Sequence, residues 1–405
     1  MMTVAKASAG RRGASVRSDV YIEIERRDAG GIEWDIRSKV DAFFSDTTRK
    51  LLADGLDQFG IEHARVTVED QGALPFVIMS RLEAVVRRLV PDKTVEPWLP
   101  EAESAKEESD RKRPRRSRLY LPGNEPKFML NAPLHQPDAL ILDLEDSVAP
   151  SEKDAARILV RNALIHLNFQ SCEAMVRINQ GELGLEDLAF IVPYGVQLVL
   201  IPKVEDASQV SAVVEEIERL SRNHDRDEPV WLMPIIESAK GAWFGYEIAS
   251  AHDTVVALAI GLEDYTADIG AQRTNEGRES FWARSQVVNA ARAAGVQPID
   301  TVFSDVSDMD ALMESVQEAK SLGFEGKGCI HPRQIEVVHR GFAPSSEEIA
   351  KAKKIVLAFE EADRQGLGVV SLGSKMIDPP VVKRALRTVS LAEMDGLLSP
   401  DWREE

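Results

Sequence analysis

From residue 118 onwards, short apolar runs alternate with longer stretches in which apolar residues recur at helical spacing. There are eight such runs: Arg118–Leu121, Ala139–Leu144, Ala174–Ile178, Leu198–Pro202, Trp231–Ile236, Val255–Ile260, Pro298–Phe303 and Gly328–His331. Apolar strands separated by helices are typical of a parallel sheet that is buried on both faces. Eight of them within about 215 residues fit a closed (β/α)8 barrel better than an open sheet. The sequence therefore predicts an α/β fold of the TIM-barrel type.

The first 90 residues have a different pattern. Val20–Glu25 and Ala64–Asp70 alternate between apolar and polar positions, which indicates two strands. Val40–Phe59 and Leu74–Val90 have apolar residues three to four positions apart, which indicates two helices. Residues 1–18 are small and basic without periodicity and are expected to be frayed. A small α+β domain is therefore expected in front of the barrel.

The composition shifts between Pro100 and Arg116, where charges of both signs accompany two prolines and no large apolar residue. This stretch predicts a linker, and its basic run, residues 111–118, is interpreted as a linker leading into the first barrel strand rather than as a binding patch. After Pro344 the pattern predicts a helix over 347–365, a glycine-rich turn and a final helix. The predicted parts are an N-terminal domain (1–98), a charged linker (99–116), the barrel (117–343) and a C-terminal helical extension (344–405).

The overall composition narrows the class of protein. With 44% hydrophobic and 29% charged residues among 405, the chain has enough apolar material for a large globular core. The net charge of −18 argues against a nucleic-acid binder but not against anionic substrates, because one arginine or metal ion can dominate locally. Two cysteines exclude a disulfide framework and fit a reducing cytoplasm. No apolar run approaches the roughly 20 residues of a membrane span, and the N-terminus has no secretory pattern.

Polar and charged residues directly follow six of the eight predicted strands. They are Asp143, Glu145 and Asp146 after the second strand, Arg177 and Asn179 after the third, Lys203 after the fourth, Glu237 after the fifth, Glu263 and Asp264 after the sixth, and His331 after the eighth. Because the carboxyl ends of barrel strands lie on one rim, these side chains are expected to surround one site.

Glu237 and Asp264 follow neighbouring strands and are predicted to share one divalent cation. Mg²⁺ prefers oxygen ligands and keeps several waters, so one or two carboxylates with substrate oxygens are its usual ligands. Arg177 on the same rim offers a planar fork for a carboxylate or for a carbonyl that becomes an enolate. The alternatives are that each carboxylate only caps the following helix, and that Arg177 only pairs with Asp143 or Glu145.

Seven segments form a specific pattern: RLYLPGNEP (118–126), ILDLEDSVAPSEKDAAR (141–157), VRINQ (176–180), IIESAKG (235–241), GLEDYTADIGAQRTNEG (261–277), DTVFSD (300–305) and GVVSLGSKMIDPPVV (368–382). In this order and spacing they resemble the β subunit of citrate lyase. That subunit belongs to the HpcH/HpaI superfamily of aldolases and lyases, which includes malyl-CoA and citramalyl-CoA lyases. The resemblance covers essentially all of residues 116–395.

The resemblance implies an Mg²⁺-dependent retro-aldol cleavage of a 3-hydroxyacyl thioester to an acetyl thioester and a 2-oxo acid such as oxaloacetate. Glu237 and Asp264 match the metal ligands of the family, and Arg177 matches the arginine that contacts the thioester and the developing oxyanion. Asp378 matches an aspartate on a C-terminal segment that reaches over from a neighbouring subunit to supply a proton. A homotrimer or homohexamer is expected on the same ground.

Four further residues are given roles through the same resemblance. Glu145 and Asp146 are expected to hold the waters of the metal ion and the arginine of the site in place. Arg118 and Lys127 are expected to form a basic edge that suits the phosphates of a CoA-like arm.

The N-terminal segments SDVYIEI (18–24) and VEDQGALPFVIMSRLEAVVRR (68–88) resemble the citrate lyase γ subunit, an acyl carrier protein. In that family a serine carries a phosphoribosyl-dephospho-CoA arm. The corresponding position falls on Arg17 here, and the nearest serines are Ser18 and Ser15, of which Ser18 is the predicted attachment site. The resemblance therefore implies a carrier–lyase fusion.

Three functions are open at this point. The first is a citryl-thioester lyase with a fused carrier, which works with a citrate lyase α-like subunit. The second is a malyl-CoA or citramalyl-CoA lyase that uses free CoA thioesters, which the segment CIHP (329–332) favours. The third is a non-catalytic carrier or scaffold subunit. His331 is expected to bond to backbone rather than to act as a base.

Overall fold

The computed structural model describes residues 5–39, 41–91, 94–101, 108–364, 370–372 and 375–403 of the chain. Their contacts divide the chain into two units, Met1–Val338 and His339–Glu405. The first unit contains the N-terminal domain and a barrel, and the second contains the C-terminal helices.

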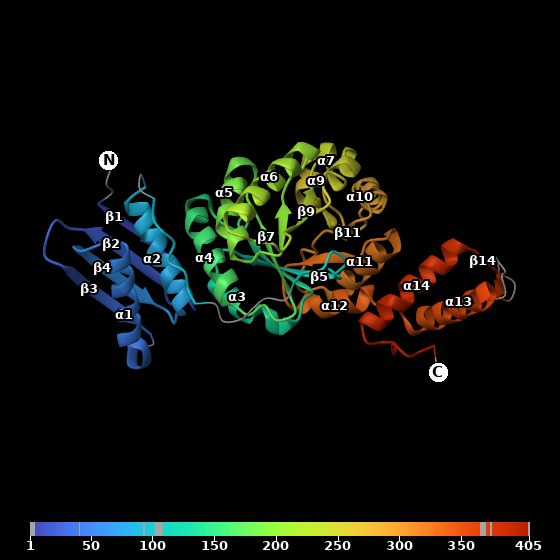
Figure 1. The fold of residues 1–405 in the computed structure, drawn as a ribbon, viewed down its shortest axis with the longest axis horizontal. Coiled ribbons are helices and arrows are strands. Elements are labelled where there is room, and N and C mark those ends of the chain that lie inside the picture. The colour runs from blue at the N-terminus through green and yellow to red at the C-terminus, as the bar shows by residue number, and fades with distance from the viewer. Residues whose placement is uncertain are drawn as a thin grey trace. The chain divides into compact units, whose positions relative to one another are not determined.

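Eight parallel strands close a barrel, which confirms the predicted fold class (Figure 1). They follow one another around the barrel in chain order, and the last strand pairs with the first. The strands are β5 (Ser117–Pro122), β6 (Ala139–Asp143), β7 (Glu173–Arg177), β8 (Leu198–Ile201), β9 (Trp231–Ile236), β10 (Ala257–Ile260), β11 (Gln297–Asp300) and β12 (Gly326–Cys329). Each of them overlaps one of the eight apolar runs of the sequence.

Helices cover the outside of the barrel (Figure 1). They are α3 (Pro126–Asn131), α4 (Lys153–His166), α5 (Gly181–Ile191), α6 (Ala207–Asn223), α7 (Ala239–Trp243), α8 (Gly245–Ala249), α9 (Leu262–Asp268), α10 (Phe281–Ala294), α11 (Met309–Leu322) and α12 (Arg333–Phe342). Three short 3-10 turns, η1 (Ala132–His135), η2 (Pro150–Glu152) and η3 (Val192–Tyr194), lie between them in the chain.

The interior of the barrel is apolar and its floor is closed. The interior residues include Ala139, Ile141, Met175, Leu198, Leu200, Met233, Ile235, Ala257, Ala259 and Ile299. At the amino ends of the strands, Arg115 and Glu173 form a fully buried ion pair with an N–O distance of 2.7 Å. The indole N–H of Trp231 donates to the backbone oxygen of Ser109 at 2.8 Å. The described end of the predicted linker is therefore part of the barrel floor.

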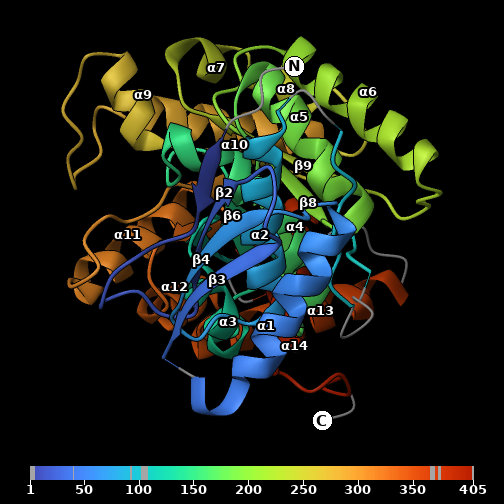
Figure 2. The ribbon, with the colours of Figure 1, turned by 90° about the vertical axis from the view of Figure 1, so that its left-hand side faces the viewer.

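A four-stranded sheet and two helices form the N-terminal domain. The strands are β1 (Lys6–Ala9), β2 (Val20–Arg26), β3 (Ile32–Ser38) and β4 (Ala64–Asp70), in the order β1-β2-β4-β3. β2 is antiparallel to β1 and β4, β3 is parallel to β4, and Figure 2 shows β2, β4 and β3 side by side. The helices are α1 (Asp41–Gln58) and α2 (Pro75–Leu89).

Two of these strands differ from the expectation. Residues 1–18 were predicted to be frayed. This prediction is wrong for β1, which pairs with β2 from Lys6 opposite Glu25 to Ala9 opposite Ile22. β3 was not predicted, although Ile32, Trp34 and Ile36 alternate and pack against the core of the domain. The sheet is therefore twice as wide as the sequence analysis indicates.

Helix α2 contacts both the N-terminal sheet and barrel helix α4. Arg161 of α4 donates to both oxygens of Glu83 of α2, at 3.0 and 2.7 Å, and both side chains are buried. Arg81 of α2 donates to Asp19 and to the backbone oxygen of Asn124, in the loop after β5. Buried, charge-assisted hydrogen bonds thus fix the N-terminal domain to the barrel.

Breaking the Glu83–Arg161 pair is expected to destabilise the protein. Glu83→Ala leaves a buried guanidinium without its carboxylate, and losing one partner of a buried pair typically lowers the free energy of unfolding by about 3–5 kcal/mol. The double variant Glu83→Leu/Arg161→Met should recover most of this loss, because no buried charge is left unpaired: Arg87, which also pairs with Glu83, is 30% exposed. Urea denaturation followed by circular dichroism measures the difference. Equal stability of Glu83→Ala and the unsubstituted protein would contradict this account of the interface.

The second unit is built on a pair of helices. α13 (Ser346–Arg364) packs against α14 (Pro379–Met394) through buried aliphatic side chains, with Trp402 in the same cluster. A short ribbon, β13 (Val370–Leu372) and β14 (Lys375–Ile377), lies between the two helices in the chain. Across both units, none of the helices in the described ranges has the length and apolar character needed to cross a membrane.

Candidate active site

The carboxyl ends of the barrel strands surround a cavity of about 390 Å³. Its lining residues include Arg118 and Tyr120 of β5, Asp143 of β6, Asp146 after it, Arg177 of β7, Glu237 after β9 and Asp264 after β10. The structure thus places Arg177, Glu237 and Asp264 around one cavity, as predicted from their positions at the ends of the strands.

Arg177 is held by carboxylates at the carboxyl end of the neighbouring strand β6. Its Nε and Nη2 donate to the two oxygens of Asp143 at 2.6 and 2.8 Å, and its Nη1 lies 2.9 Å from Glu145 Oε2. Burial alone would raise the pKa of Asp143, but the hydrogen bonds and charge of Arg177 outweigh burial and lower it. Both structural partners that the sequence suggested are present. They fix the guanidinium on the cavity wall, 5.4 Å from the centre of the Tyr120 ring.

Glu237 is a buried carboxyl group, 6% exposed, at the end of β9. Gly261 makes room for it, because a Cβ at that position would lie 2.5 Å from Glu237 Oε1. The other oxygen accepts a hydrogen bond from the backbone N–H of Lys203 at 2.9 Å. Burial raises the pKa of Glu237 to about 8, since one backbone hydrogen bond does not replace the lost hydration. Helix α7 is capped by Ser238, so Glu237 does not serve as its cap.

Lys203, which follows β8 and Pro202, places its ammonium group among three carboxylates. Its Nζ lies 3.2 Å from Glu145 Oε1, 3.5 Å from Asp146 Oδ2 and 3.5 Å from Asp264 Oδ1. The backbone φ of Lys203 is +50°, a left-handed conformation that is unfavourable for a residue with a side chain. The position of Lys203 after a strand was predicted from the sequence, but its role as a cation at the centre of the site was not.

The donor set of this rim fits a magnesium ion. Five carboxylates surround two cations there: Asp143, Glu145, Asp146, Glu237 and Asp264 against Arg177 and Lys203. Oε2 of Glu145 is buried and forms an ion pair with Arg177 Nη1 at 2.9 Å without the geometry of a hydrogen bond, so it can still accept one from a metal-bound water. Within the described ranges no three His, Cys, Asp or Glu residues form a complete metal cage. Mg²⁺ does not need one, because it keeps several of its waters.

A second cavity of about 880 Å³ adjoins the first, since Tyr120 and Ile330 line both. Lys127 stands at this cavity with its side chain 38% exposed, as expected for part of a basic edge. His331 also lines it, and its Nδ1 accepts a hydrogen bond from the backbone N–H of Arg333 at 3.2 Å. The expectation that His331 bonds to backbone is confirmed.

The prediction of a basic edge is wrong for Arg118, whose side chain lies inside the barrel. It is 1% exposed, its Nη1 lies 3.1 Å from Met233 Sδ, and its Nη2 donates to the backbone oxygen of Asp300 at 3.3 Å. Side chains alternate along a strand, so Arg118 faces the same way as Tyr120. The sequence analysis did not apply this alternation to the first strand.

Two predicted residues have local structural roles elsewhere. Asp378 begins α14 of the second unit, where its carboxylate accepts a hydrogen bond from the backbone N–H of Val381 at 3.2 Å. Ser18 precedes β2 with a φ of +56°, beside Asp19, whose carboxylate binds Arg81. The roles of Asp378 as proton donor and of Ser18 as attachment site stay predictions.

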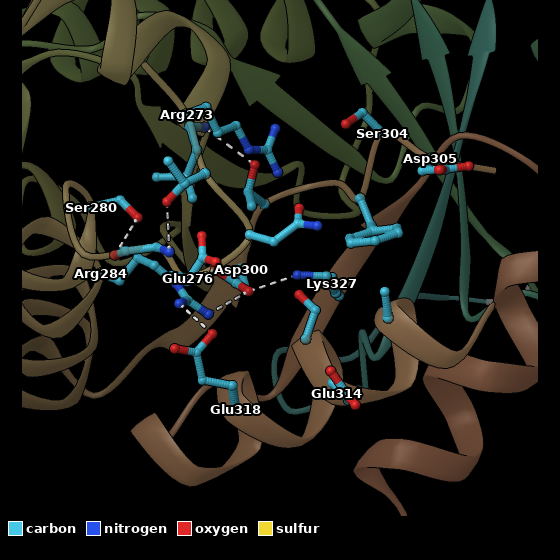
Figure 3. Close-up of a pocket in the computed structure, with 18 of the residues that line it drawn as sticks. Arg273, Glu276, Ser280, Arg284, Asp300, Ser304, Asp305, Glu314, Glu318 and Lys327 are labelled. Atoms are coloured by element: carbon cyan, nitrogen blue, oxygen red, sulfur yellow. Dashed lines mark hydrogen bonds and ion pairs between the residues drawn. The ribbon is translucent and has the colours of Figure 1, made fainter. Parts of the chain in front are cut away.

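Figure 3 shows a third cavity, of about 500 Å³, lined by residues of β11, α10 and α11. Its wall contains a chain of buried charges. Lys327 donates to Asp300 at 2.8 Å, Arg284 donates to both oxygens of Asp300 at 3.1 Å, and Arg284 also donates to Glu318 at 2.8 Å. Both oxygens of the Asp300 carboxylate therefore accept hydrogen bonds from Arg284, and one also accepts from Lys327, on the side of the strand that faces this cavity.

Two family models match the chain. The model described as HpcH/HpaI aldolase/citrate lyase matches residues 116–332, which contain the barrel and its rim. The model described as malonate decarboxylase delta subunit (MdcD), an acyl carrier model, matches residues 6–89, which contain the N-terminal sheet and both of its helices. The two resemblances stated from the sequence are therefore confirmed.

Individual relatives agree with these models. The chain is 40% identical over 297 residues to citrate lyase subunit beta of Escherichia coli K12, covering 73% of this chain and 98% of the relative. It is 33% identical over 292 residues to the mitochondrial citramalyl-CoA lyase of Homo sapiens, covering 69% and 86%. A structure of CitE from Mycobacterium tuberculosis in complex with magnesium, acetoacetate and coenzyme A is 31% identical, with a TM-score of 0.58, covering 70% of this chain and 99% of that chain.

The matches include the strands and loops that form the rim. The matched relatives, citrate lyase subunit beta and citramalyl-CoA lyase, are enzymes that cleave carbon–carbon bonds. The match to E. coli citrate lyase subunit beta includes nearly the full length of that subunit. The chain therefore belongs to the HpcH/HpaI aldolase/citrate lyase family, and it is a carbon–carbon lyase that carries an N-terminal domain of the acyl carrier type.

Proposed function

We propose that the chain is an Mg²⁺-dependent lyase that cleaves a 3-hydroxyacyl thioester of the citryl type into an acetyl thioester and a 2-oxo acid such as oxaloacetate. The observation that carries the proposal is that Arg177, Glu237 and Asp264 line one cavity, beside a second cavity with room for a thioester arm. The magnesium, acetoacetate and coenzyme A bound to the M. tuberculosis relative support the same chemistry.

Glu237 and Asp264 would hold the magnesium ion, and Glu145 and Asp146 would fix its waters. When bound, the ion supplies positive charge that orients the substrate hydroxyl and its neighbouring carboxylate and acidifies the hydroxyl. Lys203 balances the charge of Glu145, Asp146 and Asp264 and so keeps these carboxylates close together.

The reaction breaks one carbon–carbon bond and moves two protons. Loss of the hydroxyl proton to a base of the rim converts the hydroxyl carbon into the carbonyl of the 2-oxo acid. The bond to the adjacent carbon breaks, and its electron pair moves onto the thioester to form an enolate. Arg177 is a fixed cation on the cavity wall and would stabilise the enolate oxygen. We assign the proton that converts the enolate into the acetyl thioester to Asp378 of a neighbouring copy.

The thioester has two candidate sources. The first is a free CoA thioester, and the partly exposed ammonium of Lys127 at the second cavity is suited to phosphate groups, which a phosphoribosyl-dephospho-CoA arm also carries. The alternative is an arm attached to Ser18, with a citrate lyase α-like subunit as partner. For both, we propose a cytoplasmic homotrimer or homohexamer.

Release of a 2-oxo acid from citryl-, malyl- and citramalyl-CoA tests this function. Protein of unmodified intact mass should cleave at least one of the three with Mg²⁺, and EDTA should stop the reaction. Activity that appears only after a mass gain at Ser18 or Ser15 would support the tethered arm. The absence of cleavage in both forms would overturn the proposed substrate class.

Magnesium binding is expected to depend on pH, because Glu237 must lose its proton to act as a ligand. Its pKa of about 8 means that it is mostly protonated at neutral pH in the metal-free protein. The apparent affinity should therefore rise by up to about tenfold per pH unit below the pKa and level off above it. Isothermal titration calorimetry in two buffers of different ionisation enthalpy measures the affinity and the released proton. An affinity that falls with rising pH would contradict the role of Glu237.

A further inference from the structure

Arg118 is a charged side chain inside an apolar barrel. It is 1% exposed, and its Nε has no hydrogen-bond partner. Its other contacts are the sulfur of Met233 and the backbone oxygen of Asp300. No residue of the described ranges forms an ion pair with Arg118. A buried guanidinium keeps its charge, so the barrel holds an uncompensated cation, which is strongly unfavourable for folding.

The carboxylate of Asp300 does not form an ion pair with Arg118. Asp300 offers Arg118 only its backbone oxygen, because its carboxylate is bound by Lys327 and Arg284 in the third cavity (Figure 3). Along β11 the neighbouring Ile299 belongs to the barrel interior, so Asp300 points to the opposite side of the strand. Arg118 therefore has no ion-pair partner in the described part of the chain, and its positive charge is free to bind an anionic ligand.

Arg118 lines the same cavity as the predicted metal ligands Glu237 and Asp264. The barrel floor below it is closed by the buried ion pair of Arg115 and Glu173. In the lyase function proposed above, a substrate would enter from the rim with its thioester arm in the second cavity. The part of the acyl group that is farthest from the thioester would then point toward Arg118.

We propose that Arg118 binds a second carboxylate of the acyl group, the one farthest from the thioester, and thereby selects substrates that release a dicarboxylic 2-oxo acid. This inference rests on the lyase function proposed above and names the substrate class. A guanidinium is planar and offers parallel donors, so a carboxylate matches it in both charge and shape. A methyl group in the same place leaves the cation unpaired.

Citryl-CoA and citramalyl-CoA form a matched pair of substrates for this test. They differ only in a carboxymethyl group against a methyl group on the hydroxyl carbon, and they release oxaloacetate and pyruvate respectively. The unsubstituted protein should prefer citryl-CoA by about 100-fold or more in kcat/KM. Arg118→Met has a similar length and no charge, and should lower this preference by about 100-fold while citramalyl-CoA cleavage changes only a few-fold.

A binding measurement supplies a readout that does not depend on turnover. Calorimetry with Mg²⁺ should show oxaloacetate binding more tightly than pyruvate in the unsubstituted protein and equally in Arg118→Met. Arg118→Lys keeps the charge but loses the planar fork, and should retain an intermediate preference. Arg219→Met removes an exposed cation of α6, paired with Glu216, and serves as the control that changes neither ratio.

The outcomes separate this inference from the function on which it rests. Cleavage of citramalyl-CoA with an unchanged substrate ratio in Arg118→Met overturns the role of Arg118 and leaves the lyase proposal standing. A preference of the unsubstituted protein for citramalyl-CoA does the same. Failure to cleave either acyl group in the presence of Mg²⁺, by both the unmodified protein and protein modified at Ser18 or Ser15, overturns both proposals.

Discussion

Replacing Glu237 by glutamine is expected to lower kcat for thioester cleavage by about a thousandfold. Glutamine keeps the size of the side chain and its acceptor for the Lys203 N–H, but it removes the negative charge that a divalent ion needs. A metal ion typically supplies several kcal/mol of transition-state stabilisation, and about 4 kcal/mol corresponds to a thousandfold in rate. Asp264→Asn should act in the same direction, since this carboxylate lines the same cavity. Release of 2-oxo acid at saturating thioester and fixed Mg²⁺ measures the effect.

Glu205→Gln is the matched control for both substitutions. Glu205 follows β8 and pairs with Lys240, but it does not line the cavity and its side chain is 41% exposed. Its replacement should leave kcat within about twofold, because exposed ion pairs contribute little. Glu237→Gln with unaltered kcat and an unaltered Mg²⁺ requirement would show that the ion binds elsewhere.

Replacing Arg177 by lysine is expected to lower kcat by about 100- to 1000-fold, the usual effect of removing one donor that stabilises a developing oxyanion. Lysine keeps the charge but cannot bind Asp143 through two parallel hydrogen bonds, so its ammonium is no longer fixed on the cavity wall. The loss should appear mainly in kcat rather than in KM, because the enolate charge develops only during the reaction. Steady-state kinetics of the cleaved thioester provide both constants.

The same variant separates the role of Arg177 from that of the metal ligands. Mg²⁺ affinity in Arg177→Lys should change by less than about tenfold, because the residue is not a ligand and the substitution conserves charge. Circular dichroism should show a folded protein. Loss of Mg²⁺ binding with an unchanged kcat at saturating metal would contradict this division of roles.

The barrel was predictable because its strands are buried on both faces and so appear as apolar runs in the sequence. β1 was not, because Lys6–Ala9 contains small residues with little strand preference of their own, and pairing with β2 fixes its conformation. β3 carries an alternating pattern of Ile32, Trp34 and Ile36 that the sequence analysis overlooked. Both misses lie in the N-terminal sheet: β1 depends on pairing, whereas the pattern of β3 is readable in the sequence.

The carboxylates and Arg177 were predictable as site residues because strand ends share one rim, but the direction of single side chains was not. In a strand that is buried on both faces, the pattern does not say which residues point into the barrel, and Arg118 was misplaced for this reason. Lys203 reaches its three carboxylates only through its left-handed backbone conformation, which nothing in the neighbouring sequence indicates. Its position required the three-dimensional structure.

Counting bound Mn²⁺ by electron paramagnetic resonance tests the central claim most directly, because Mn²⁺ takes the same oxygen ligands as Mg²⁺. The proposed site predicts one ion per chain that Mg²⁺ displaces, with an affinity at least about tenfold weaker in both Glu237→Gln and Asp264→Asn. The Glu205→Gln control should bind as the unsubstituted protein does. One equally tight ion in all four proteins would show that the two carboxylates at the rim of the barrel are not its ligands.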